Sequence, residues 1–162
     1  MKILGLDPGL IQTGFGIINV NDNEVNLIDY GIIKPSSNKD LAHRLFTIYN
    51  DVCKIIVDFE PQVFAIEDVF YGKNFKSAMR LGQARGAAMV AAASNKVPIY
   101  EYSARKIKQS LTGNGNADKS QVQFMVKATL KMNHIPEPMD AADALGVALC
   151  HNQQFRILDL WL

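Results

Sequence analysis

The sequence is poor in cysteine and lacks any long apolar run. Cys53 and Cys150 are its two cysteines, and both fall in helical patterns rich in apolar residues. We therefore interpret them as reduced core thiols and exclude a disulfide framework and a zinc site. No apolar run could span a bilayer. The start, MKILGLDPG, lacks the apolar region and cleavage site of a signal peptide. These absences predict a cytoplasmic protein that acts away from membranes.

Repeats, low-complexity tracts and domain linkers are also missing from the 162 residues. A chain of this length that is 48% hydrophobic and 20% charged is typical of one compact globular domain. Its charge is unevenly distributed. Residues 70–131 hold eleven Lys or Arg against Glu101 and Asp118, a balance of +9, so the net charge of +1 leaves −8 elsewhere. This asymmetry indicates a polyanion partner beside a cation site, although solvated helix faces could also produce it.

Hydrophobic periodicity predicts an α/β fold. Alternating or continuous apolar runs predict strands at 2–7, 13–20, 25–34, 63–70 and 97–103. Spacings of three and four predict helices near 41–59, 76–94, 103–111, 118–132 and 139–152. Short links make the first three strands an antiparallel meander, and right-handed crossovers add two parallel strands. We expect a mixed five-stranded sheet flanked by helices, with the first and fourth strands adjacent at its centre.

Four carboxylates lie at the ends of apolar strands or in an apolar helix, where the predicted fold offers little structural reason for an acid. Asp7 ends the first strand, Glu67 lies near the end of the fourth, and Asp140 and Asp143 sit three apart in an apolar helix. If they converge, they cannot all stay ionised without cations. Mg²⁺ and Mn²⁺ prefer such oxygen ligands. Two of these ions ~3.5–4 Å apart can promote phosphodiester hydrolysis, which is the chemistry that this pattern predicts.

Simpler explanations of each acid remain open at the level of sequence. Asp140 could be a helix N-cap with Asp143 at the third helical position, both serving the helix amides and dipole. Asp7 could simply begin an Asp-Pro-Gly turn. Glu67 is harder to explain in an apolar strand, whereas its neighbour Asp68 faces the other way and is expected to be exposed.

Four segments together resemble the RuvC family of Holliday-junction endonucleases. They are LGLDPGLIQTGFGII, AIEDVFYGKNFKSAMRLGQARGA, TGNGNADKSQVQFMV and MDAADALGVAL, in that order and spacing. The resemblance implies a ribonuclease-H-like fold and a homodimer that uses Mg²⁺ or Mn²⁺, two ions per site, to place paired symmetric nicks in four-way DNA junctions during recombination and repair. It also implies partnership with the RuvA–RuvB branch-migration complex. It covers residues 1–151 as a nuclease domain and leaves 152–162 as a tail of unknown role.

The resemblance also implies roles for individual residues. The metal ligands and catalytic residues are Asp7, Glu67, Asp140 and Asp143. The DNA-binding residues are Phe70, Lys108 and Lys119. From the residues alone, each of these three has a plainer interpretation. Phe70 could close the core, Lys108 could be solvated, and the Gly-Asn loop before Lys119 could simply be flexible.

The second predicted helix carries a stripe of small residues. Ala78, Gly82 and Gly86 recur every four residues and permit close helix approach, either across a dimer axis or onto the sheet.

The sequence also allows other functions. The segment DPGLIQTG superficially fits the phosphate loop of actin-like ATPases, but that fold needs two such domains. A junction-binding module without catalysis and an RNA-processing relative of the nuclease fold are two further candidate functions.

Overall fold

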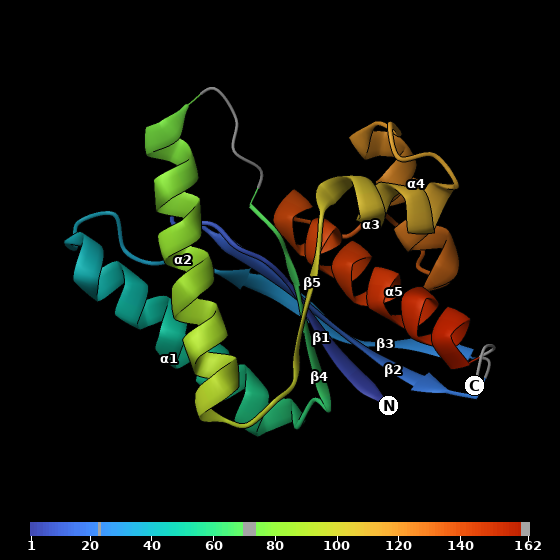
Figure 1. The fold of residues 1–162 in the computed structure, drawn as a ribbon, viewed down its shortest axis with the longest axis horizontal. Coiled ribbons are helices and arrows are strands. Elements are labelled where there is room, and N and C mark those ends of the chain that lie inside the picture. Colours follow the sequence, from blue (N-terminus) through green and yellow to red (C-terminus); the bar gives the residue numbers. More distant parts are fainter. Residues whose placement is uncertain (23, 70–73, 160–162) are drawn as a thin grey trace.

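The computed structural model describes residues 1–22, 24–69 and 74–159. Within these ranges it forms one sheet with helices on both faces (Figure 1). The strands are β1 (Lys2–Asp7), β2 (Thr13–Asn21), β3 (Glu24–Ile33), β4 (Val63–Glu67) and β5 (Ile99–Tyr102). The helices are α1 (Leu41–Phe59), α2 (Phe75–Ser94), α3 (Ala104–Thr112), α4 (Lys119–Thr129) and α5 (Met139–Asp159).

The sheet has the predicted topology. Its strand order is β3-β2-β1-β4-β5. The pairs β1–β2 and β2–β3 are antiparallel, whereas β4 is parallel to both β1 and β5. Because Leu6 lies opposite Ile66 in the parallel pair, Asp7 and Glu67 leave the two central strands at the same edge. Ligands usually gather at this carboxyl edge of parallel strands.

The two faces of the sheet carry different helical layers (Figure 1). α1 and α2 cover one face, and α5 crosses the other with α3 and α4 beside it. Alternation along β1 divides the core between them. Leu4 and Leu6 belong to the cluster under α1 and α2, whereas Ile3 belongs to the cluster under α5. Asp7 continues the face of Ile3 and therefore points toward α5.

Several element ends follow local signals in the sequence. A capping box starts α4, with the Asp118 carboxylate accepting from the Gln121 N–H and the Gln121 side chain accepting from the Asp118 N–H. α4 is shorter than predicted and ends at Thr129, and β4 ends at Glu67 instead of reaching residue 70. The shorter β4 matches its neighbour β5, which offers only four residues to pair with.

α5 is longer than predicted, since it continues to Asp159. Its buried His151 shares a 2.8 Å hydrogen bond at Nδ1 with the Tyr102 hydroxyl. Cys150, next to it, is buried, and Cys53 on α1 is half-buried; both are free thiols. No helix in the described ranges is long and apolar enough to cross a bilayer. The division into a domain of residues 1–151 and a tail of 152–162 stays a prediction.

Candidate metal centre

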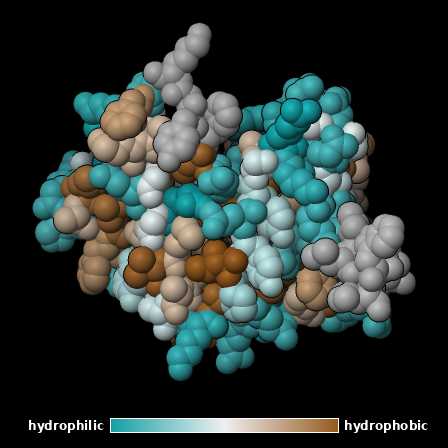
Figure 2. Space-filling view, viewed as in Figure 1, coloured by the Kyte–Doolittle hydropathy of each residue, from teal (hydrophilic) through white to brown (hydrophobic). Residues whose placement is uncertain are grey.

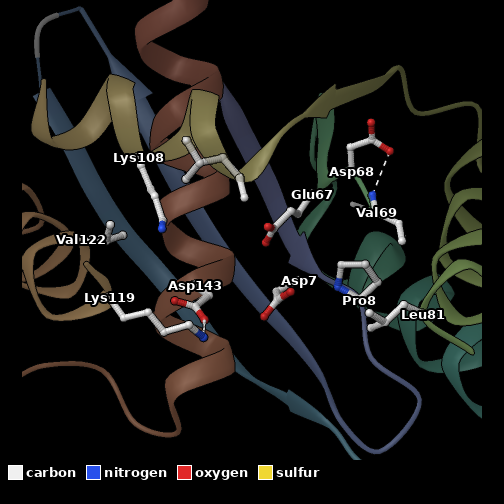
Figure 3. A pocket seen from close by; sticks show the side chains of 12 residues that line it. Asp7, Pro8, Glu67, Asp68, Val69, Leu81, Lys108, Lys119, Val122 and Asp143 are labelled. Carbon is white, nitrogen blue, oxygen red and sulfur yellow. Dashed lines mark hydrogen bonds and ion pairs between the residues drawn. The ribbon is translucent and has the colours of Figure 1, made fainter. Parts of the chain in front are cut away.

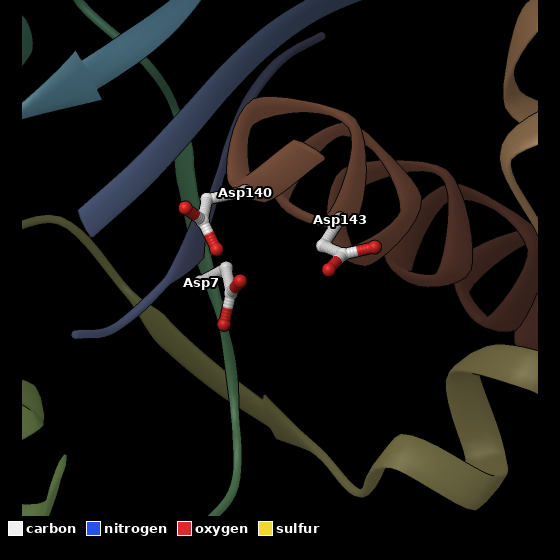
Figure 4. Close-up of side chains that lie close together, drawn as sticks. All are labelled: Asp7, Asp140 and Asp143. Atoms are coloured by element: carbon white, nitrogen blue, oxygen red, sulfur yellow. The ribbon is translucent and has the colours of Figure 1, made fainter. Parts of the chain in front are cut away.

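Three of the four predicted acids meet where β1 ends and α5 begins. One carboxylate oxygen from each of Asp7, Asp140 and Asp143 lies within 4.8 Å of the others (Figure 4). Glu67 stands outside this group of three but lines the same pocket, of about 380 Å³, with Asp7 and Asp143 (Figure 3). The structure therefore brings all four acids to one place, as the sequence predicted.

Glycines on β1 and β2 allow α5 to come this close. A Cβ atom added to Gly14 would lie 1.9 Å from the carbonyl oxygen of Asp140, and one added to Gly5 would lie 2.2 Å from that of Ala144. Gly16 similarly faces the side chain of Leu145. Since these are mostly backbone contacts, a larger residue would have to push the helix away from the sheet. The glycines thus set the distance between the strand acid and the two helix acids.

The site raises the pKa values of its two strand carboxyls. Burial raises the pKa of Asp7 from 3.8 to about 8, with further contributions from the charges of Glu67, Asp143 and Asp140. Burial and the charge of Asp143 also raise the pKa of Glu67. Both effects disfavour the ionised forms. A divalent cation would reverse them, so the donor set fits a hard metal ion.

Two lysines partly offset this negative charge. Lys119, the first residue of α4, places its ammonium 3.2 Å from Oδ2 of Asp143. The pair raises the pKa of Lys119. Lys108 on α3 lines the same pocket, and its charge counteracts part of the rise in the pKa of Glu67 (Figure 3). Around them, hydrophilic side chains gather over α3 and α4 in the space-filling view (Figure 2). Both lysines therefore lie beside the acids.

Gln12 is a site residue that the sequence reasoning missed. Its side-chain amide donates a hydrogen bond to Oδ2 of Asp140. The loop that carries it is closed by buried Thr13, whose hydroxyl donates to the Gly9 carbonyl at 2.7 Å and accepts from the Gly9 N–H at 3.1 Å. A lone Gln after an Asp-Pro-Gly turn gives no sequence signal, because its partner lies 128 residues away.

The helix-capping explanation for the last two acids is wrong. α5 begins at Met139, so Asp140 lies inside its first turn and Asp143 in the next turn. Asp140 still benefits from the positive end of the helix dipole. Asp7 is the last residue of β1, directly before Pro8 and Gly9. Asp68 is exposed as expected, with 56% of its side chain accessible.

The structure describes some of the remaining predicted residues and leaves one outside its described ranges. Phe70 lies outside the described residues. On α2, a Cβ atom added to Gly82 or Gly86 would meet no atom of the described residues within 4 Å. These two glycines therefore do not permit packing on the sheet, which excludes one of the two interpretations of the small-residue stripe for them. Ala78 is buried.

Comparison with known proteins decides which family this site belongs to. The sequence model described as "Crossover junction endodeoxyribonuclease RuvC" matches residues 3–151. The chain belongs to the RuvC family. A RuvC of Vibrio vulnificus is 54% identical over 149 residues, which are 92% of this chain and 85% of that protein. A RuvC of Caldicellulosiruptor saccharolyticus is 47% identical over 152 residues, which are 93% of this chain and 92% of that protein.

The structural comparison agrees with the sequence comparison. Thermus thermophilus RuvC, solved in complex with a Holliday junction substrate, superposes with a TM-score of 0.92 at 33% identity. The match covers 97% of this chain and 96% of that RuvC chain. The predicted ribonuclease-H-like fold is thereby confirmed. The family is one of endodeoxyribonucleases, so the actin-like ATPase interpretation is wrong.

Proposed function

We propose that this chain resolves four-way DNA junctions as an endodeoxyribonuclease, by paired symmetric nicks, in homologous recombination and repair. The observation that carries the proposal is the convergence of four acids in a RuvC-family chain: Asp7, Glu67 and Asp143 line one pocket, and Asp140 lies beside Asp7 and Asp143. These acids would hold two Mg²⁺ ions, for which Mn²⁺ could substitute. When bound, the ions supply Lewis-acid chemistry for the attack of water on a phosphodiester, which leaves 5′-phosphate and 3′-hydroxyl ends.

The residues of the chain have separate tasks in this proposal. The four carboxylates bind and orient the cations. Lys108 and Lys119, which line the same pocket, contact phosphates of the junction. Phe70, which follows the catalytic strand, stacks on an unpaired base.

Removing either lysine should weaken binding to all junction sequences. It should also reduce the slope of the logarithm of the binding constant against the logarithm of the salt concentration by about one unit. An unchanged slope would argue against a phosphate contact.

The functional unit in this proposal is a homodimer that forms through α2. Met79, Gly82, Gly86 and Val90 lie along one stripe of this helix, and all four are exposed in the single chain. Two small residues between two apolar ones suit a close helix–helix contact. Two-fold symmetry suits a junction in which two equivalent strands are cut together.

Gly82→Arg should yield monomers in sedimentation equilibrium. A wild-type monomer at working concentration would refute the dimer. We also propose that the dimer acts with the RuvA–RuvB complex.

A nicking assay tests the proposed reaction. The wild-type protein should place paired nicks in a synthetic four-way DNA junction with Mg²⁺ present and none when a chelator replaces it. Linear duplex DNA and a structured RNA of equal length serve as substrate controls. Asp7→Asn should abolish nicking while leaving junction binding largely intact. Wild-type nicking by this variant, or equal cleavage of the RNA, would contradict the proposal.

A further inference from the structure

Arg85 of α2 reaches across to the end of the strand that carries Glu67. Its Nε donates a hydrogen bond to the main-chain carbonyl of Glu67 at 3.3 Å. Its Nη2 forms an ion pair with the Glu101 carboxylate on β5 and lies 3.6 Å from Oδ1 of Asp68. Only 16% of the Arg85 side chain is accessible. One guanidinium group therefore joins α2 to the ends of β4 and β5.

The contacts of Arg85 separate two neighbouring acids that could compete for the metal centre. Glu67 turns its carboxylate toward Asp7 and Asp143, whereas Asp68 turns away from them (Figure 3). The Asp68 N–H donates to the Tyr102 carbonyl at 2.9 Å, which extends the pairing of β4 with β5 beyond the strand. Arg85 supports the same arrangement from the helix side, because it binds the main chain of Glu67 and the side chain of Asp68.

Arg85 does not act on Glu67 by neutralising its carboxylate. The charges that shift the pKa of Glu67 are those of Asp143, Lys119 and Lys108. The guanidinium charge is instead matched by Asp68 and Glu101. Arginine suits this position because its planar fork can serve several acceptors at once, which the single ammonium of lysine cannot do.

We propose that Arg85 is a positioning residue for the metal centre. It holds the main chain at Glu67 so that this carboxylate faces Asp7 and Asp143, and it keeps Asp68 and Glu101 out of the cluster. This inference rests on the proposed function, since it assumes that Glu67 is a metal ligand. Residues that orient metal ligands typically change metal affinity roughly 10- to 100-fold when they are replaced.

Positioning and simple charge predict opposite effects on metal affinity. If Arg85 were only a positive charge near the acids, Arg85→Ala would tighten metal binding and Arg85→Lys would leave it unchanged. If Arg85 orients Glu67, both variants weaken metal binding. Arg80→Ala is a matched control, because Arg80 is an exposed arginine of the same helix and its removal changes the net charge equally.

The experiment is a titration of metal-stripped protein with Mn²⁺ by isothermal calorimetry, without DNA. We expect a dissociation constant about tenfold or more above wild type for Arg85→Lys and Arg85→Ala, and one close to wild type for Arg80→Ala. Junction nicking by Arg85→Lys should then need more Mn²⁺ for half-maximal rate and recover at saturating Mn²⁺. A purely structural defect would not recover in this way.

Three outcomes overturn the inference. They are wild-type affinity in Arg85→Lys, tighter binding in Arg85→Ala, and a nicking defect in Arg85→Lys that saturating Mn²⁺ does not correct. Circular dichroism checks that the variants are folded, and Arg85→Lys decides the matter if Arg85→Ala is not. Failure of the proposed function itself looks different, because the wild-type protein would then bind no Mn²⁺ or nick no junction.

Discussion

The Asp7 carboxylate should destabilise the metal-free protein, because it is buried among other acids. Its pKa is raised from 3.8 to about 8, first by burial and then by the charges of Glu67, Asp143 and Asp140. A carboxyl group with a higher pKa in the folded state stabilises that state below pH 3.8, and this contribution is lost as the pH rises through about 8. Asp7→Asn removes the ionisation while nearly preserving size.

The expected gain in stability can be worked from this shift. At pH 7 Asp7 is ionised in the unfolded chain, whereas it is still protonated in most molecules of the folded metal-free chain. About three pKa units separate 3.8 from pH 7, and at about 1.4 kcal/mol per unit they limit the destabilisation to about 4 kcal/mol. Even a quarter of this, about 1 kcal/mol, would raise Tm by about 2–4 °C in a protein of this size.

Thermal melting with a chelator present measures the effect. Asp7→Asn should melt above wild type, and the difference should widen from pH 5 to pH 8. Mg²⁺ should then raise the Tm of wild type, since a ligand stabilises the state that binds it, and raise that of Asp7→Asn far less. Asp58→Asn makes the same chemical change at an exposed position of α1 and should leave Tm nearly unchanged. The reasoning fails if Asp7→Asn melts at or below wild type at pH 8 in chelator.

Three further predictions concern other parts of the molecule. Gly14→Ala should lower the free energy of unfolding by about 1–3 kcal/mol and weaken Mn²⁺ binding, because its Cβ would meet the backbone of α5, whereas Gly146→Ala meets only side chains at 3.3 Å or more and should cost less; equal chemical-denaturation curves for the two would contradict this. Buried His151 has its pKa lowered from 6.5 to about 4, so unfolding should become easier by about 2 kcal/mol from pH 7 to pH 5 as the unfolded imidazole takes up a proton. Urea titrations at several pH values should show that the free energy of unfolding of His151→Gln falls less between pH 7 and pH 5 than that of wild type. An equal fall in both proteins would exclude this histidine as the cause. Lys119→Ala should tighten Mn²⁺ binding about two- to fivefold in calorimetry because it frees a carboxylate, and Lys108→Ala should do so less; the reverse order would show that the ion pair does not compete with metal.

Much of the fold was predictable because its signals are local. Alternation placed Ile3 and Asp7 on one face of β1, and the short turns required the meander that the structure contains. The parallel pairing of β1 with β4 followed from the rule for crossovers. These inferences needed only neighbouring residues and general topology, so they were correct without any knowledge of distant contacts.

Other features of the site depend on where α5 lies, which no local pattern specifies. From sequence, Asp140 fitted a helix cap as well as a metal ligand. The start of α5 at Met139 excluded the cap, and the close contact of α5 with Gly5 and Gly14 brought Asp140 to the end of β1. The open side of Gly82 likewise became evident only when the helix was placed on the sheet. Gln12 and Arg85 gave no signal at all, because their partners are far away in the chain or belong to the backbone.

The sequence by itself determined the elements, their order in the sheet, the four acids and, through the quoted motifs, the resemblance to one nuclease family. Tertiary structure alone decided which acids meet, what shifts their pKa values, and which neutral or basic side chains hold them. The physical reason is the separation along the sequence over which each interaction acts. Periodicity and turn chemistry act over a few residues, whereas burial and repulsion between Asp7 and Asp143 arise only when chain segments more than a hundred residues apart pack together.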